Sequence, residues 1–137
     1  MRKTLLKLSG LAALILAAGC QTTGTQPDPN EPAPAANPAY QSEMSKFNAQ
    51  FPNAKATKYE DESLAFNNAN KLDEKGNCHD KSKWPVVIIL VLDAEGKVTS
   101  STTDVQGAKA ACFVKAYEGV QFPKPPFAPY RKPIRLR

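Results

Sequence analysis

The side chains with the most reactive chemistry in this sequence are three cysteines and a single histidine, and two of these four are adjacent in Cys78-His79-Asp80. A thiol, an imidazole and a carboxylate could form a catalytic triad or contribute metal ligands. Three adjacent side chains cannot converge on one reacting atom, however, as a nucleophile, a base and its orienting carboxylate must. One histidine and two distant cysteines also do not complete a zinc shell. We therefore predict no catalytic or metal role here, and we expect His79 at the surface of a polar loop.

Other catalytic motifs are missing from the sequence. It contains no Cys-x-x-Cys, no glycine-rich phosphate loop and no Gly-x-Ser-x-Gly. The acidic run Glu60-Asp61-Glu62 is interpreted as a solvated turn rather than as a pair of poised carboxylates. We predict that the protein is not an enzyme and that it uses no cofactor, no metal and no small-molecule substrate.

Cys20 ends a segment that is typical of protein export. Basic residues open the chain, an apolar core covers residues 8–18, and the small residues Ala17-Ala18-Gly19 directly precede the cysteine. This ending resembles the lipobox of bacterial lipoproteins, which implies a signal peptide at 1–19 and a lipidated Cys20 as the first mature residue. The alternatives are a plain signal peptide with a cysteine nearby and a weak membrane span, although the apolar run is far shorter than the ~20 residues that cross a bilayer.

The residue after the cysteine bears on location. In lipoproteins of many Gram-negative cells an aspartate at this position implies retention in the inner membrane, and this chain has Gln21 instead. The resemblance therefore implies a lipid-anchored protein of the cell envelope, at the outer membrane and facing the periplasm.

Residues 21–39 contain five prolines and no large apolar side chain. A segment of this composition cannot bury enough apolar surface to offset its ordering entropy. We therefore predict that residues 20–40 form a disordered or extended tether between the lipid and one small domain at 41–137. Fully extended, about twenty residues would hold that domain roughly 60 Å from the bilayer at ~3.1 Å per residue.

The charge of the mature chain is nearly balanced. Three of the 18 lysines and arginines precede Cys20, which leaves 15 against 13 acidic residues and argues against nucleic acid as a partner. Basic residues nevertheless gather near the end, where Lys115, Lys124, Arg131, Lys132, Arg135 and Arg137 accompany only Glu118. A solvated basic tail is the simplest interpretation. The alternative is contact with acidic lipid headgroups, lipopolysaccharide or cell-wall polymers, which salt would weaken.

Cys78 and Cys112 are the two cysteines that remain. An even pair in an exported chain forms a disulfide more often than a metal or redox site. The bond would close a loop of about 35 residues and add roughly 4 kcal/mol to the free energy of unfolding in the chain-entropy model. We predict a structural disulfide.

The apolar pattern after residue 84 predicts a hairpin followed by a helix. Val86–Leu92 is dominated by β-branched side chains and predicts a central strand that is buried on both faces. Asp93–Gly96 supplies the turn, and residues 97–105, rich in Val, Thr and Ser, return as an edge strand. Residues 107–119 predict a helix with Cys112 on the face pressed against the sheet.

Two shorter helices are expected before the hairpin. Ser42 would cap the first, whose Met44, Phe47 and Phe51 would enter the core before Pro52 ends it. A second helix is expected at 63–75. The whole pattern predicts an α+β fold, in which a small antiparallel sheet, made of the hairpin and a carboxy-terminal edge strand, packs on one or two helices and holds one disulfide.

Aromatic residues and prolines alternate between Phe122 and Tyr130. The prolines exclude a central strand, so we expect the chain to cross here in polyproline form. Phe122, Phe127 and Tyr130 are candidate anchors for a protein partner if they are exposed. The alternative is that all three pack beneath the helix.

An edge strand is predicted at 133–137. Arg135 and Arg137 are two positions apart and so share one face, while Ile134 and Leu136 point to the core. An unpaired edge offers backbone donors and acceptors that another chain can complete. We predict that this edge, or the strand at 97–105, docks an extended segment of an envelope protein.

Several of these features occur together in an order that resembles the carboxy-terminal domain of TonB-type proteins. They are Pro85 at the start of a strand, the run Leu92-Asp-Ala-Glu-Gly-Lys-Val98, a helix that holds Cys112, and the exit Phe122-Pro-Lys-Pro125. The similarity covers residues 78–137 and is closest to the branch that pairs a cysteine before the first strand with one in the helix. In that family the sheet lends an edge to a partner's strand. TonB itself transduces energy through an inner-membrane helix; a lipid anchor is expected here, so energy transduction is not implied.

These observations favour a non-enzymatic, membrane-anchored envelope lipoprotein that acts as a protein-binding or scaffold module. By analogy of fold it could be accessory to a transport or secretion complex. The alternative is an inhibitor of a cell-wall hydrolase or another periplasmic ligand-binding lipoprotein, with the loop Cys78–Trp84 as its inhibitory element. The expected partners are a membrane, through the lipid, and an envelope protein, but not nucleic acid.

Overall fold

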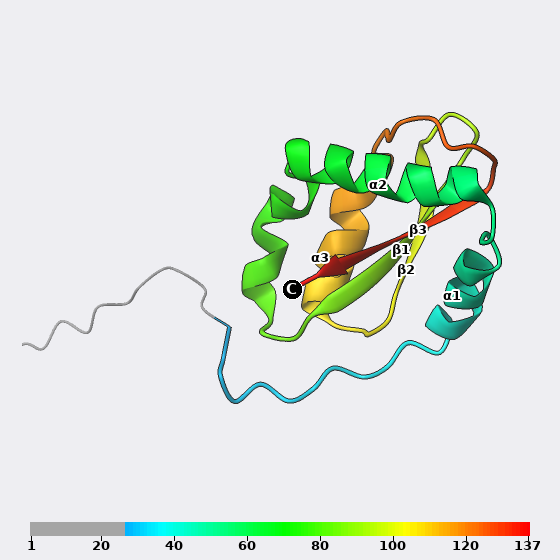
Figure 1. Ribbon diagram of the computed structural model, residues 1–137. Helices are drawn as coiled ribbons and strands as arrows, with labels where there is room; N and C mark the ends of the chain where they lie inside the picture. The colour runs from blue at the N-terminus through cyan, green and yellow to red at the C-terminus, as the bar shows by residue number, and fades with distance from the viewer. Residues whose placement is uncertain (1–26) are drawn as a thin grey trace, which may run out of the picture.

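A computed structural model describes residues 27–137 (Figure 1). Its elements are α1 (Tyr40–Asn48), α2 (Ala54–Ala69), the 3₁₀ segment η1 (Leu72–Lys81), β1 (Val86–Leu92), β2 (Val98–Thr103), α3 (Ala108–Tyr117) and β3 (Tyr130–Leu136). The strands form one antiparallel sheet in the order β2-β1-β3. The predicted α+β fold, with its hairpin, its carboxy-terminal edge strand and one disulfide, is confirmed. The predicted signal peptide at 1–19 and the lipidated Cys20 lie outside the described residues.

β1 is the central strand, and both of its faces are buried, as predicted. Every second residue from Val86 to Leu92 is at most 2% exposed and faces the main core, whereas Ile89 is fully buried on the opposite face. The turn into β2 uses Gly96 at φ 91°, where a Cβ would collide with the carbonyl oxygen of Phe122. Local sequence therefore determines the hairpin, and glycine is required at its turn.

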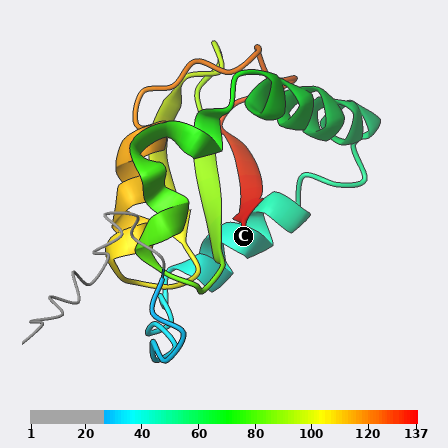
Figure 2. The ribbon, with the colours of Figure 1, turned by 90° about the vertical axis from the view of Figure 1, so that its left-hand side faces the viewer.

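Helices cover both faces of the sheet. Figure 2 shows α3 and η1 on one face and α1 on the other. α3 places the fully buried Phe113 and Tyr117 against the strands. α2 adds Tyr59, whose ring meets that of Tyr130 edge to face with centroids 4.7 Å apart. The main core therefore lies between the sheet and α2, α3 and η1.

The face of α3 that meets the sheet differs from the prediction. Ala110, Phe113 and Tyr117 are buried there, whereas Cys112 is half-buried at the side of the helix next to η1. Aromatic rings bury far more apolar area than alanine or cysteine side chains do. The helix is therefore turned so that its rings, and not Cys112, face the strands.

The N-cap of α1 lies three residues earlier than predicted. Ser42 lies inside the helix, Ala39 occupies the N-cap without a side-chain bond, and the Asn37 side chain accepts from the Ala39 amide at 3.1 Å. One side of α1 is half-buried against the face of the sheet opposite the main core. The Phe47 ring of this helix meets the Phe51 ring edge to face, with the ring centroids 5.1 Å apart. Ser42 does not act as the N-cap, because the turn at Asn37 already starts the helix.

The helix predicted at 63–75 is wrong in its bounds. α2 starts after Asn53, whose side chain accepts from the Lys55 amide at 2.9 Å as an N-cap. Ser63 does not cap a helix; it is fully buried within α2, and its hydroxyl donates to the Tyr59 carbonyl. The run 60–62, predicted as a solvated turn, is therefore one turn of α2.

Residues 27–39, which we call the strap, belong to the predicted disordered or extended tether but are bonded to the domain; residues 20–26 of that tether lie outside the described residues. The strap runs along the domain, and Ala36 forms a bridge with Val105 just beyond β2 (Figure 1). The amide of Asn37 donates to the Asp104 carbonyl and that of Gln106 to the Ala35 carbonyl, both at 2.8 Å. Composition did not predict the attachment of this segment to the domain, because backbone hydrogen bonds hold the segment and such bonds need no apolar side chain.

Side chains of the domain also hold the strap. The Trp84 indole donates to the Glu31 carbonyl at 3.1 Å, and the Lys83 ammonium donates to the Pro29 carbonyl at 2.6 Å. The Gln106 side-chain amide donates to the Ala36 carbonyl at 3.1 Å. The strap is thus tied to the domain along most of its length.

β3 starts at Tyr130, earlier than the predicted residues 133–137. Pro133 lies within it, opposite Ile89 of β1. A proline is compatible with an edge strand when its nitrogen faces away from the neighbouring strand. The edge position therefore allows the strand to continue through Pro133.

Candidate functional site

Cys78 and Cys112 form the predicted disulfide, with their Cα atoms 5.5 Å apart. The bond joins η1 to α3, two elements that enclose the core from one side. A disulfide sulfur has no thiolate to act as a nucleophile or metal ligand. The position of the bond between these two elements indicates a structural role.

His79 ties η1 to the end of β3 rather than standing free in a loop. Its Nδ1 lies 2.7 Å from the Arg137 backbone oxygen and its Nε2 lies 3.1 Å from a carboxylate oxygen of Asp73. The ring also meets Phe113 edge to face at 5.0 Å. These contacts account for the histidine without chemistry on a substrate.

The predicted aromatic anchors do not form an exposed face. Phe122 is 2% exposed and Tyr130 is fully buried, while Phe127 is half-buried. The Tyr130 hydroxyl donates to a Glu60 carboxylate oxygen at 2.6 Å. Burial, together with this carboxylate, raises the pKa of Tyr130 far above its usual value. The prediction of partner-binding anchors is therefore wrong for Phe122 and Tyr130, which pack in the core as the alternative held.

Arg135 and Arg137 are exposed, and Ile134 and Leu136 are buried, as the alternation in the sequence predicts. Their backbone belongs to the outer strand of the sheet. The arginine side chains thus remain candidates for a partner contact.

The outer edge of β3 is largely closed by α1 and by proline. The side-chain amide of Gln50 donates to the Arg131 carbonyl at 3.1 Å, and its oxygen accepts from the Arg131 amide at 2.6 Å. Arg131 therefore faces away from β1, and in an antiparallel pair so does every second residue, including Pro133. Proline offers no donor there. Within β3, only Arg135 therefore keeps both an outward N–H and an outward carbonyl for another strand.

Charged side chains also hold α1 against β3. The Glu43 carboxylate of α1 accepts from Lys46 at 2.9 Å and from Arg131 at 3.2 Å. These bonds, the Lys46 bond first, hold the pKa of Glu43 below its usual value. α1 is thereby fixed against β3.

The outer edge of β2 is bridged at its two ends; between them it pairs with no other described strand, and Thr103 is 6% exposed there. Gln121 bridges Lys97 at its start, and the strap bridges Val105 just beyond its end. The Asp104 amide donates to the Val87 carbonyl, so this residue faces β1. By alternation, Ser101 and Thr103 point their backbone groups away from β1. Neither group bonds to the strap, because Pro38 turns the chain away into α1.

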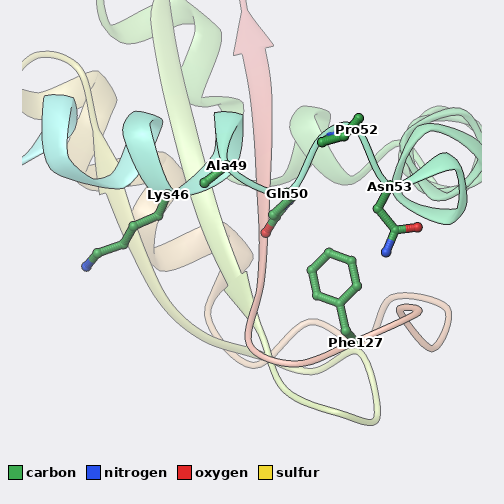
Figure 3. Close-up of a pocket in the computed structure, with 6 residues that line it drawn as sticks. All are labelled: Lys46, Ala49, Gln50, Pro52, Asn53 and Phe127. Atoms are coloured by element: carbon green, nitrogen blue, oxygen red, sulfur yellow. The ribbon is translucent and has the colours of Figure 1, made fainter.

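Figure 3 shows an open hollow of about 590 Å³ where α1 meets the loop before β3. Its lining consists of Lys46, Ala49, Gln50, Pro52, Asn53 and Phe127. The Phe127 ring points from the loop toward the end of α1, and Gln50 is already bonded to β3. The hollow brings together no acid, base or nucleophile in an arrangement for catalysis.

A second hollow, missed by the sequence analysis, lies between η1 and α3 beside the disulfide, and three lysines surround it. Among residues 27–137, no group of three or more histidine, cysteine or acidic side chains is placed to hold a metal ion. In the same part of the chain no helix is long and apolar enough to span a membrane. Comparisons of the chain with protein-family models, with curated proteins and with solved structures found no match.

Proposed function

We propose that the protein is a non-enzymatic lipoprotein of the cell envelope, anchored through Cys20 at the outer membrane, whose domain binds an extended segment of another envelope protein along β2. The observation that carries the proposal is the strap. Residues 35–37 add to the end of the sheet's β2 side through backbone hydrogen bonds. This side therefore accepts an extended chain, which is the requirement for binding by strand addition.

The two edges of the sheet are not equal candidates. On β3, Gln50 occupies the outward backbone groups of Arg131 and Pro133 has no N–H, so only Arg135 keeps both of its outward groups. On β2, the half-buried Ser101 directs its backbone groups outward beside the buried Thr103, in line with the strap. The short length of this open stretch and its polar side chains protect the protein from self-association. A partner strand beside β2 would continue the line that the strap begins at Ala36.

Substitution of Ser101 by proline tests this proposal. Proline removes the outward N–H of an edge residue and leaves the ladder to β1 intact, so the fold should persist while binding falls. The matched control is Ser101→Ala, which keeps the N–H and removes only the hydroxyl. The measurement is the recovery of cross-linked envelope proteins with the tagged lipoprotein from detergent extracts.

We expect Ser101→Ala to recover the same partner as the wild-type protein, and Ser101→Pro to lose it while its circular dichroism is unchanged. Equal recovery by both variants would exclude strand addition at β2. Recovery of a soluble hydrolase in place of a membrane protein would favour the inhibitor alternative.

The structure gives that alternative no further support. The loop Cys78–Trp84 was its candidate inhibitory element, yet His79 is bonded to Asp73 and Arg137, and Trp84 to the strap. An inhibitory loop needs an exposed group that can enter a cleft. We therefore propose only the binding module.

A further inference from the structure

The hollow between η1 and α3 is a groove of about 630 Å³ with a basic rim. Its floor is formed by Gly76, Ala108, Ala111, Cys112 and Ala116, and its rim by Lys75, Lys81 and Lys115. All three lysines are exposed, and among residues 27–137 none of them takes part in an ion pair. We call this surface the lysine groove.

The disulfide assembles the lysine groove. Lys75 and Lys81 stand three residues before and after Cys78, and Lys115 stands three residues after Cys112. Joining the two cysteines brings these ammonium groups to one surface. Their mutual repulsion is left uncompensated by any carboxylate in the groove lining, so the groove favours an anionic occupant.

The strap begins beside this groove. Pro27 lines an adjoining hollow that shares Gly76, Lys81 and Ala108 with the lysine groove. Acidic residues line that hollow as well, namely Asp28, Glu31 and Asp80, so the positive surface is confined to the groove itself. The chain thus leaves the domain toward its amino terminus next to the groove.

The length of chain beyond Pro27 is short. Seven peptide units separate Pro27 from Cys20. A fully extended chain covers at most about 3.6 Å per residue, so these units reach roughly 25 Å. Because the strap holds residues 27–39 against the domain, a lipid on Cys20 cannot place the domain at the roughly 60 Å expected for a free tether of twenty residues.

We propose that the lysine groove docks on the membrane that holds the lipid of Cys20 and binds the headgroups of anionic phospholipids there. This inference rests on the proposed lipid anchor. The anchor keeps the groove within reach of the surface, and each lysine near an anionic surface favours the docked state by about fivefold. The opposite face of the sheet, which carries α1 and Arg135, then points away from the membrane (Figure 2).

Energy transfer from Trp84 measures this orientation in the full-length lipidated protein. Trp84 is the only tryptophan of the chain, and it lines a small cavity together with Lys81 and Ala108 of the groove. The acceptor is a dansyl-labelled phosphatidylethanolamine. Vesicles are made of phosphatidylcholine alone or with about one third phosphatidylglycerol, which supplies the anionic headgroups.

We expect stronger transfer in the anionic vesicles than in the neutral ones, and loss of this difference at high salt. The triple variant Lys75→Gln, Lys81→Gln, Lys115→Gln should give the same transfer in both. The matched control, Lys55→Gln, Lys58→Gln, Lys124→Gln, removes the same charge from exposed positions outside the groove and should behave as the wild-type protein.

Equal transfer in the two kinds of vesicle for the wild-type protein would overturn the proposal. So would a groove variant that keeps the dependence on anionic lipid, or a control variant that loses it. Flotation of the vesicles separates this failure from failure of the anchor. Protein that floats with both vesicles but shows no lipid dependence retains the anchor and contradicts only the docking, whereas protein that floats with neither contradicts the anchor itself.

Discussion

At the scale of single residues, the domain contains two buried lysines that are satisfied in different ways. Lys109 is 3% exposed, and its ammonium donates to the carbonyls of Ser82 and Trp84 at 3.1 and 2.9 Å. Burial lowers the pKa of Lys109, and Glu31 opposes that shift. Lys132, also 3% exposed, donates instead to a Glu60 carboxylate oxygen at 2.6 Å. A buried cation costs free energy unless such partners are present.

Glu60 therefore stabilises the domain more than its neighbours in α2 do. Replacing Glu60 with alanine leaves the Lys132 ammonium buried without a counter-ion, and we expect the free energy of unfolding to fall by about 3 kcal/mol. Glu62→Ala is the control, because its pair with Lys58 is exposed and removing it should change stability by less than about 0.5 kcal/mol. Urea denaturation measures both.

Replacing Lys132, the other member of the buried pair, is a second test of the same contact. Lys132→Met should cost less than Glu60→Ala, because the Glu60 side chain is 20% exposed and still accepts the Tyr130 hydroxyl. Equal costs for Glu60→Ala and Glu62→Ala would show that the buried pair contributes nothing beyond a surface contact.

At the scale of elements, the strap has the largest effect on how the domain is presented. It covers the end of the sheet's β2 side, contacts Trp84 and ends where α1 begins. Because it carries no large apolar side chain, backbone hydrogen bonds supply much of its attachment. Each such bond contributes only about 1 kcal/mol net, so the strap is a separately releasable unit of the fold.

Hydrogen exchange tests the strap directly. The amides of Asn37 and Gln106 donate to carbonyls across the contact, so we expect both to exchange more slowly than amides of a disordered chain. Trp84→Phe removes the indole donor to Glu31 and keeps an aromatic ring, and it should accelerate exchange at Asn37. The amide of Asp104, which bonds to β1, serves as the control and should be unaffected. Free exchange at Asn37 in the wild-type protein would restore the disordered tether.

At the scale of the whole molecule, the strap and the proposed lipid on Cys20 would together set the distance between domain and membrane. The length of chain between Cys20 and the attached part of the domain falls from about twenty residues to the seven peptide units before Pro27, and the reachable height falls accordingly. A short link raises the effective concentration of the domain at the surface. A modest number of lysines is then sufficient to orient it.

The anchor itself is tested by replacing Cys20 with alanine. We expect this variant to leave the membrane fraction and to lose labelling by a radioactive fatty acid, because the acyl chains supply the membrane affinity. Gln21→Ala keeps the cysteine and is the control. Labelling that survives the loss of Cys20 would refute the lipoprotein assignment.

Sequence by itself determined the central features of this fold. The β-branched run Val86–Leu92 predicts a strand buried on both faces, and Gly96 predicts the turn after it. The pairing of Cys78 with Cys112, predicted from the number of cysteines and the expected export of the chain, is present in the structure. These predictions succeed because they depend on local backbone preference and on periodic burial, which neighbouring residues encode.

Tertiary structure alone decided which surfaces remain available. From the sequence, Phe122 and Tyr130 were candidates for exposure, but in the structure α2 covers both. The sequence also left the whole β2 side available, but the strap bonds there to residues about seventy positions away in the chain. The lysine groove was in principle predictable, because Lys75 and Lys81 flank one half-cystine and Lys115 follows the other. The attachment of the strap was not predictable from the sequence, since backbone hydrogen bonds between distant segments are independent of side-chain pattern and leave no signal in composition.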